Sequence, residues 1–274
     1  IKDTPEFLNI EGENIELLDN KSGGKKYLCI VGSRKCTHYS KDVIDNLVSK
    51  LPSNVVIISG LALGVDAYAH SSAIKYGLAT IAVPGSGLDR DILHPQTNVK
   101  LANDIISNNG LLISEYSNNF KATLYSFPAR NRIMAAMCDA LLIVESEEKS
   151  GTQITARLAL EYGRDIGIIP GSIFWPNSVG TMKLWKDGAT PICDISDLLE
   201  LLRIGNSNNQ GSLDLMPALS EKEKAIYDLL IEPLDKESLI ASAGLSFTDG
   251  LVALMTLEGK GVIKEQFGEI RRVI

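Results

Sequence analysis

Short apolar runs rich in β-branched residues recur along the first 200 positions, separated by segments whose apolar residues follow a helical period. Strands that alternate with helices are typical of βαβ units, so the pattern predicts an α/β fold with a mostly parallel sheet covered on both faces. The expected strands are 27–31, 55–58, 80–83, 111–113, 140–144, 166–169 and 190–192. The expected helices are 41–50, 65–76, 97–108, 130–137, 152–163, 181–186 and 194–203.

The two ends of the chain follow other patterns. Residues 1–26 contain extended pieces at 7–10 and 15–18 broken by turn residues, which predicts a lead-in hairpin or extension before the main domain at 27–204. Residues 205–218 form a polar linker. Beyond it, Ser220 and Glu223 form a capping box, followed by helical patterns and a two-strand ribbon at 262–266 and 269–274. Three helices and a ribbon predict a small winged helix at 219–274.

Composition restricts the class of protein. The chain is 45% hydrophobic with a mean hydropathy of +0.06, and no apolar run approaches the roughly 18 residues of a membrane span. A formal charge of −7 argues against a surface covered in basic patches, so a nucleic-acid site would have to be a confined groove. Because the chain begins at Ile1 rather than at methionine, we expect that an upstream piece, and with it any targeting segment, has been removed.

Cysteine and histidine spacing gives no metal site. The four cysteines and three histidines include no CxxC pair and no His pair one helical turn apart, so we expect neither a zinc site nor another cofactor. Cys29 and Cys138 lie in or beside apolar segments and are interpreted as small core residues. Free thiols favour a reducing compartment, the cytoplasm.

Small-residue turns follow the expected strands on what would be one edge of the sheet. The first strand ends in Gly32-Ser33-Arg34, without the glycine fingerprint of a dinucleotide site, and Arg34 is either a phosphate ligand or an incidental arginine. Further turns contain Ser59-Gly60 with Gly64, and Gly85. Their convergence predicts a crevice that recognises phosphate.

The segment 127–155 carries the strongest candidate chemistry. Arg130 and Arg132 surround Asn131, and Lys149-Ser150-Gly151-Thr152 opens a helix after the fifth strand. Free backbone N–H groups at a helix start and forked arginine donors both suit phosphate.

Several nearby polar residues have structural alternatives. Asp66 is interpreted as accepting from backbone N–H groups at a helix start, and His70 as a core or surface residue rather than a ligand. Glu115 and Glu145 would act as acid and base only if the fold brought them together, and we expect Glu145 to orient Arg34 or Arg130 instead. The sequence contains no G-x-S-x-G elbow, Walker A loop or readable Ser/His/Asp triad, so we do not expect an enzyme.

The motifs in their order resemble the bacterial DNA-processing protein A family, DprA or Smf. The matching text is IVGSRK, ISGLALGVDAYAH, AVPGSGLD, LISE, FPARNRIMAAMCDALLIVES, KSGTQITARLALEYGR, IPGSI and KDGATPI within residues 29–204. This resemblance implies an extended Rossmann-like three-layer domain that binds single-stranded DNA as a homodimer and recruits the RecA recombinase during natural transformation. The binding residues it implies are Gly32, Ser33, Arg34, Ser59, Gly60, Gly64, Arg130, Asn131, Arg132, Lys149, Ser150, Gly151 and Thr152.

The sequence departs from the family pattern at a few positions. Leu63 stands where a glycine loop often has arginine, Met182 and Trp185 replace Asn and Ile, and Ser40 replaces glycine. The loss of an arginine at position 63 implies that Arg34, Arg130 and Arg132 bear more of the phosphate binding.

Two alternatives stay open beside this interpretation. A small-nucleotide sensor or phosphoribohydrolase of the related LOG family would use a similar crevice, although no Glu follows Thr152 at the position its motif requires. A scaffold with a vestigial pocket would bind no nucleic acid.

The predicted winged helix is acidic. Within 219–274 seven basic and ten acidic residues give a net charge of 7 − 10 = −3, and the expected helix 247–258 has no basic residue. We therefore do not expect this region to read a DNA sequence, although Arg271 and Arg272 could contact a phosphate.

Overall fold

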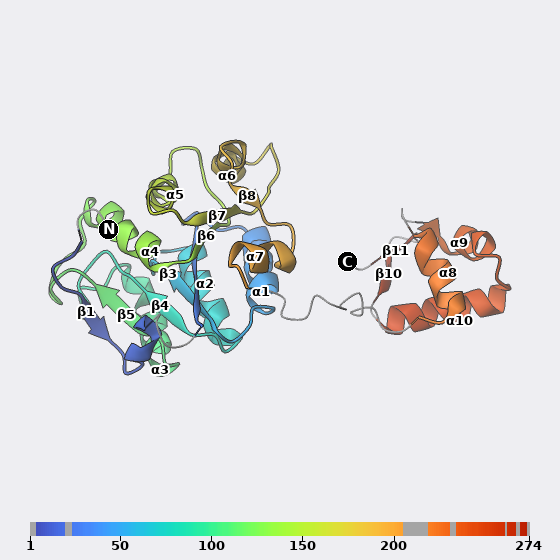
Figure 1. Cartoon of the computed structure of the whole chain (residues 1–274), viewed down its shortest axis with the longest axis horizontal. Helices are drawn as coiled ribbons and strands as arrows, with labels where there is room; N and C mark the ends of the chain where they lie inside the picture. The colour runs from blue at the N-terminus through green and yellow to red at the C-terminus, as the bar shows by residue number, and fades with distance from the viewer. Residues whose placement is uncertain are drawn as a thin grey trace. The chain divides into compact units, whose positions relative to one another are not determined.

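An eight-stranded sheet forms the centre of the first of two compact units, Ile1–Gly205 and Asn206–Ile274 (Figure 1). The computed structural model describes residues 4–19, 24–204, 219–230, 234–260, 262–266 and 269–272. The strands of the large sheet are β1 (Asn9–Glu11), β2 (Lys26–Val31), β3 (Val55–Ser59), β4 (Thr80–Ala82), β5 (Leu111–Ser114), β6 (Ala140–Ile143), β7 (Asp165–Ile168) and β8 (Thr190–Pro191). The predicted strands from β2 to β8 are confirmed, each within two residues.

The strand order is β1-β5-β4-β3-β2-β6-β7-β8, and every neighbouring pair is parallel except β1 with β5. From β2 the chain builds outward through β3, β4 and β5, and then crosses back to place β6 on the other side of β2. In the β2–β6 pairing, Leu28 is opposite Ala140 and Val31 is opposite Ile143. The loops that follow β2 and β6 therefore diverge at this point, which is where open α/β sheets form a ligand crevice.

Helices cover both faces of the sheet, as the alternating pattern predicts. They are α1 (His38–Val48), α2 (Val65–Lys75), α3 (Val99–Ser107), α4 (Ser126–Met137), α5 (Gly151–Glu161), α6 (Pro176–Lys186) and α7 (Ile195–Leu201), with a 3-10 turn at Gln96–Asn98. On one face α1, α2 and α7 pack on alternate side chains such as Leu28 and Ile57, and α3 extends that layer. On the other, α4, α5 and α6 pack on Cys29, Val56 and Leu141.

Two helices, α4 and α6, begin at least four residues earlier than the sequence pattern indicates. α4 starts at Ser126 rather than at residue 130, and α6 starts at Pro176 rather than at 181. Each first turn contains a proline, Pro128 and Pro176, and a proline is tolerated there because the first N–H groups of a helix have no partner within the helix. The earlier start of α4 places Phe127 on the helix.

Of the two forms expected for the lead-in, a hairpin or an extension, the described residues form an extension of the large sheet. Asn9–Glu11 pairs with β5 instead of with its own neighbour, and Ile15–Leu18, expected to be extended, forms a 3-10 helix. Leu17 from that turn is buried in the core, and its carbonyl accepts a 2.7 Å hydrogen bond from the Tyr27 hydroxyl. These contacts attach the lead-in to the large sheet.

The second unit has its own small core. It contains α8 (Glu221–Leu229), α9 (Lys236–Ser242), α10 (Phe247–Gly259) and an antiparallel sheet of β10 (Ile263–Gln266), β11 (Glu269–Arg272) and β9 (Leu234–Asp235). This is the predicted winged-helix arrangement, with the short strand β9 added to the expected ribbon. The linker predicted at 205–218 lies outside the described residues.

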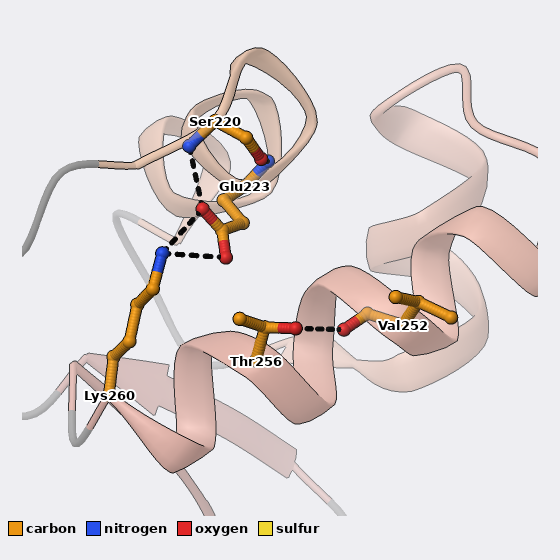
Figure 2. A network of polar contacts seen from close by, with 5 residues as sticks. All are labelled: Ser220, Glu223, Val252, Thr256 and Lys260. Carbon is orange, nitrogen blue, oxygen red and sulfur yellow. Dashed lines mark hydrogen bonds and ion pairs between the residues drawn. The ribbon is translucent and has the colours of Figure 1, made fainter.

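The capping box that predicts α8 is present and is extended by a lysine (Figure 2). The Ser220 N–H donates to Glu223 Oε2 at 2.6 Å, and Lys260 Nζ lies 2.9 and 2.8 Å from the two Glu223 oxygens. Lys260 directly follows α10, so the ion pair ties the C-terminal end of α10 to the first turn of α8.

Among the described residues, no single helix is long and apolar enough to span a membrane. α9 and α10 reach that length and apolarity only together, and the pair is bent by 112°.

Candidate nucleic-acid-binding site

The loop after β2 forms the centre of the site. Gly32 lies so close to α2 and to the loop after β6 that an added Cβ would stand 2.8 Å from Val65 Cγ2 and 3.0 Å from the Glu145 carbonyl oxygen, so this position requires glycine. The Ser33 carbonyl accepts from the Val65 N–H at 3.1 Å, and Ser33 Oγ accepts from the Lys35 N–H at 3.1 Å. The backbone of the loop is therefore fixed, while the Arg34 side chain is exposed.

The loop after β3 supports the site from beneath. Asp66 Oδ2 accepts from the Gly60 N–H at 3.1 Å, which confirms the structural role expected for Asp66. Burial raises the pKa of this carboxyl, and the nearby Arg130 guanidinium acts in the opposite direction. Gly64 has φ +78° and packs on the Ser33 and Arg34 backbone. Ser59 is buried and donates to the Ile30 carbonyl at 2.6 Å, so it joins β3 to β2 and is not exposed to a ligand.

Arg130 is a buried cation at the floor of the site. Its guanidinium donates to the carbonyls of Gly60 and Val83, and its Nε donates to Asn131 Oδ1 at 3.1 Å. Burial lowers the pKa of Arg130, and Asp66 counteracts this effect. Arg130 therefore fastens the loops after β3 and β4 to α4 and also contributes positive charge to the cavity floor.

Glu145 does not orient an arginine as expected. Its two carboxylate oxygens accept from the Thr37 N–H at 3.2 Å and from Thr37 Oγ1 at 2.5 Å, so it holds the start of α1. Glu115 pairs with Arg132 instead. The two glutamates thus have separate partners and do not form an acid–base pair.

The loop after β6 leads into the open start of α5. Ser150 precedes the helix without a side-chain cap, and its hydroxyl is 2.8 Å from Ser146 Oγ. The first N–H groups of a helix lack partners within the helix and carry its positive dipole, so Gly151 and Thr152 present donors suited to an anion. Lys149 is exposed on the approach to this turn.

These loops enclose a cavity of about 390 Å³ at the switch point between β2 and β6. Eight of the fourteen predicted site residues line it: Gly32, Ser33, Arg34, Arg130, Asn131, Ser150, Gly151 and Thr152. Gly60 lines a smaller adjoining hollow of about 40 Å³ with Arg34 and Leu63. The other five predicted residues line neither the cavity nor the smaller hollow: Ser59, Gly64, Gly85, Arg132 and Lys149.

Arg132 lies away from the cavity because it is two residues beyond Arg130 on the same helix. Its Nη1 and Nη2 each lie 2.6 Å from a Glu115 oxygen, and both side chains are mostly buried. Arg132 does not line this cavity, so a role for it in binding DNA stays a prediction.

Apolar walls are the part of the site that the residue patterns did not single out. Phe127 lines both hollows, and its ring centroid is 5.5 Å from the Arg34 guanidinium carbon and 5.4 Å from the His94 ring. Gly85 belongs to this wall, since an added Cβ would stand 2.7 Å from the Phe127 ring. Pro128, directly after Phe127, is the signal in the sequence that a helix begins here, because proline is tolerated in the first turn of a helix. That start places the Phe127 ring on the helix.

The described residues contain no group of three or more His, Cys, Asp or Glu side chains that could hold a metal ion. His70 is buried as a core residue, with Nδ1 2.7 Å from Thr80 Oγ1, and burial lowers the pKa of its imidazole to about 3. The cavity instead combines Arg34, Arg130, a helix start and an aromatic wall, with Glu147 as an acidic residue at its edge.

Comparisons with known proteins agree with the resemblance in the motifs. A family model described as DNA recombination-mediator protein A matches residues 1–203. The DNA processing protein DprA of Streptococcus pneumoniae is 38% identical over 199 residues, and that of Bacillus subtilis is 37% identical over 203. These alignments cover 73% and 74% of the chain, and 67% and 66% of the relatives, so the chain spans about two thirds of each relative's length. A solved structure of DNA processing protein A from Helicobacter pylori, described with its single-stranded DNA binding mode, superimposes with a TM-score of 0.65 at 34% identity over 74% of this chain and 90% of that one.

Proposed function

The chain belongs to the DNA recombination-mediator protein A family, and from that membership and the chemistry of the cavity we propose that it binds single-stranded DNA at the β2–β6 switch point. The observation that carries the proposal is the exposed Arg34 beside the open start of α5, above the buried Arg130. The Helicobacter pylori relative is described as binding single-stranded DNA, which supports the same ligand class here.

Different side chains of the cavity would contact the phosphate and the base of a bound strand. Phosphate would lie against the Gly151 and Thr152 N–H groups and the Arg34 guanidinium, where forked donors and a helix dipole both favour an anion. Arg130, held by backbone carbonyls, supplies a fixed charge that needs no reorganisation. Phe127 offers an apolar face on which a base can lie, a contact that does not depend on sequence.

The wider role that we propose is to protect incoming DNA and load RecA recombinase onto it in the cytoplasm during natural transformation. The four cysteines are free thiols, in keeping with a reducing compartment. We further propose a homodimer through the Rossmann-like unit. Ile173 and Phe174, which precede α6, are 74% and 85% exposed, and an apolar pair of this kind supports such a contact. The role is that of a mediator rather than a catalyst.

The test is titration of purified protein with oligothymidine at several salt concentrations. Affinity should fall with salt at a log–log slope of about −0.7 for each phosphate neutralised. Gel shifts with single- and double-stranded DNA, repeated with RecA, examine strand preference and loading separately. Absent or salt-independent binding would refute the proposal, and turnover of AMP or a cytokinin nucleotide would favour the hydrolase instead.

A further inference from the structure

Leu124 and Tyr125 are exposed to an unusual degree beside the cavity. Their exposed fractions are 86% and 87%, the highest of any large hydrophobic side chain among the described residues. Burying apolar surface away from water is favourable, so two adjacent apolar side chains exposed to water form a surface that gains from contact.

The turn that carries them has a fixed backbone. The Ser126 N–H donates to Thr123 Oγ1 at 3.2 Å, and the Thr123 N–H donates to Ser126 Oγ at 2.9 Å. The Tyr125 carbonyl accepts from the Ala129 N–H at 3.2 Å, which places it at the start of α4. The two side chains are therefore presented from an ordered turn, and ordering them against a ligand costs little backbone entropy.

The segment before the turn is also anchored. The Gly87 N–H donates to the Phe120 carbonyl at 2.9 Å, and the Phe120 ring stacks on Tyr116 with centroids 4.2 Å apart. Lys121, between this anchor and the turn, is exposed. The pair thus has a basic residue in the same loop, as a single-strand path requires.

Leu124 is continuous with the cavity, since it lines that space together with Phe127 and Arg34. A strand whose phosphate is held at the α5 start and whose base lies along Phe127 would place its neighbouring nucleotide over Leu124 and Tyr125. We infer that Leu124 and Tyr125 form a base-stacking shelf for that neighbouring nucleotide. The inference rests on the proposed function and extends the binding site from the nucleotide in the cavity to the next nucleotide along the strand.

Single-stranded nucleic acid fits the shelf better than a duplex does. Bases in a duplex are stacked on one another and offer no face to a side chain, whereas an unpaired base can lie on an aromatic ring whatever its identity. Leu124 and Tyr125 carry no charged group, so they would add affinity without adding to the salt dependence.

The experiment compares Tyr125→Ala with Tyr125→Phe, and uses Tyr76→Ala, at the far end of α2, as the matched control. Each full-length variant is titrated with oligothymidine and with an abasic oligomer of the same length, after thermal melting has shown that it is folded. Because stacking is worth about 1–3 kcal/mol per base, Tyr125→Ala should raise the Kd for oligothymidine roughly 5- to 150-fold. Tyr125→Phe and Tyr76→Ala should stay within about twofold, and the abasic oligomer should bind wild type and Tyr125→Ala equally.

The alternative outcomes separate the shelf from the proposed function. If Tyr125→Ala binds oligothymidine like wild type while Arg34→Ala binds weakly, the shelf is refuted and the pocket stands. If Tyr125→Ala changes only the sedimentation of the protein, the surface joins two copies of the chain and the shelf is refuted. If wild type binds no single-stranded DNA, both the function and the shelf fail.

Discussion

Arg132 Nη2 lies 2.6 Å from Glu115 Oε2, and this ion pair turns one of the two arginines around Asn131 away from the cavity. On a helix, positions two apart differ by about 200°, so Arg130 and Arg132 face opposite directions on α4. Arg130 lies under the cavity and Arg132 fastens α4 to the residue after β5. The two arginines of one motif therefore have different roles.

Replacing Arg132 should reduce stability rather than DNA affinity. Arg132→Ala leaves Glu115 mostly buried without its partner, so the free energy of unfolding should fall by roughly 1–3 kcal/mol, between the values of exposed and buried pairs. Chemical denaturation measures the fall, and oligothymidine titration should give a Kd within about twofold of wild type. A large loss of affinity in a folded variant would show that the strand also reaches Arg132.

Arg34 is the arginine whose loss should weaken DNA binding most directly. Arg34→Ala should lower the affinity for oligothymidine and reduce the salt slope by about 0.7, because one exposed phosphate contact is removed. Arg271→Ala is the comparison in the second unit, where we expect little change. The guanidinium of its neighbour Arg272 already has partners within the unit. Its carbon lies 4.2 Å from the Tyr227 ring centroid, and its Nη2 donates to the Tyr227 carbonyl at 2.7 Å. Equal effects of the two variants would move the site to the winged helix.

Residue patterns predict the large sheet well because its strands are continuous buried runs that no amphipathic helix would show. The pattern fails at Ile15–Leu18, where an alternating apolar segment forms a 3-10 turn whose Leu17 is held by Tyr27. That contact, like the pairing of β1 with β5 across about a hundred residues, depends on tertiary structure and leaves no periodic signal.

The site is predictable to the level of its loops and less so to the level of its side chains. Parallel strands bring their carboxyl ends to one edge, so the loops after β2, β3 and β6 could be placed together from the order of elements alone. Partners of charged residues could not be assigned in the same way. Glu145 is held by Thr37, 108 positions away, where an arginine partner was expected. Phe127 was missed because the start of α4 was placed too late.

Gly60 should be intolerant of even a methyl group. A Cβ at this position would collide with the Arg130 guanidinium, which is itself fixed by the Gly60 and Val83 carbonyls. Gly60→Ala should therefore lower the free energy of unfolding by about 1–3 kcal/mol and weaken oligothymidine binding by displacing the floor of the cavity. Gly259→Ala, where an added Cβ meets nothing within 4 Å, is the matched control, and it should neither lower the free energy of unfolding nor weaken DNA binding. An unaffected Gly60→Ala protein would mean that Arg130 has room to move.

The Glu223 carboxylate should make the stability of the second unit depend on acid. Hydrogen bonds from Lys260 and from the Ser220 N–H lower the pKa of Glu223 below its ordinary value (Figure 2). A carboxyl whose folded pKa is depressed stabilises the fold above its unfolded pKa of about 4.3, and this contribution is lost as the pH falls through the lower folded value. Glu223→Ala removes the reciprocal cap and the ion pair, and should cost on the order of 1–2 kcal/mol at neutral pH.

Thermal or denaturant unfolding of the full chain, followed at pH 7 and at steps below pH 4.5, measures both effects. The stability difference between wild type and Glu223→Ala should shrink as the pH falls through the Glu223 titration. Glu221→Ala removes an acid from the same first turn but leaves the Lys260 pair intact, so its stability difference from wild type should stay nearly constant. If the gap between wild type and Glu223→Ala stays constant down to pH 2, the cap and not the charge holds α8 to α10.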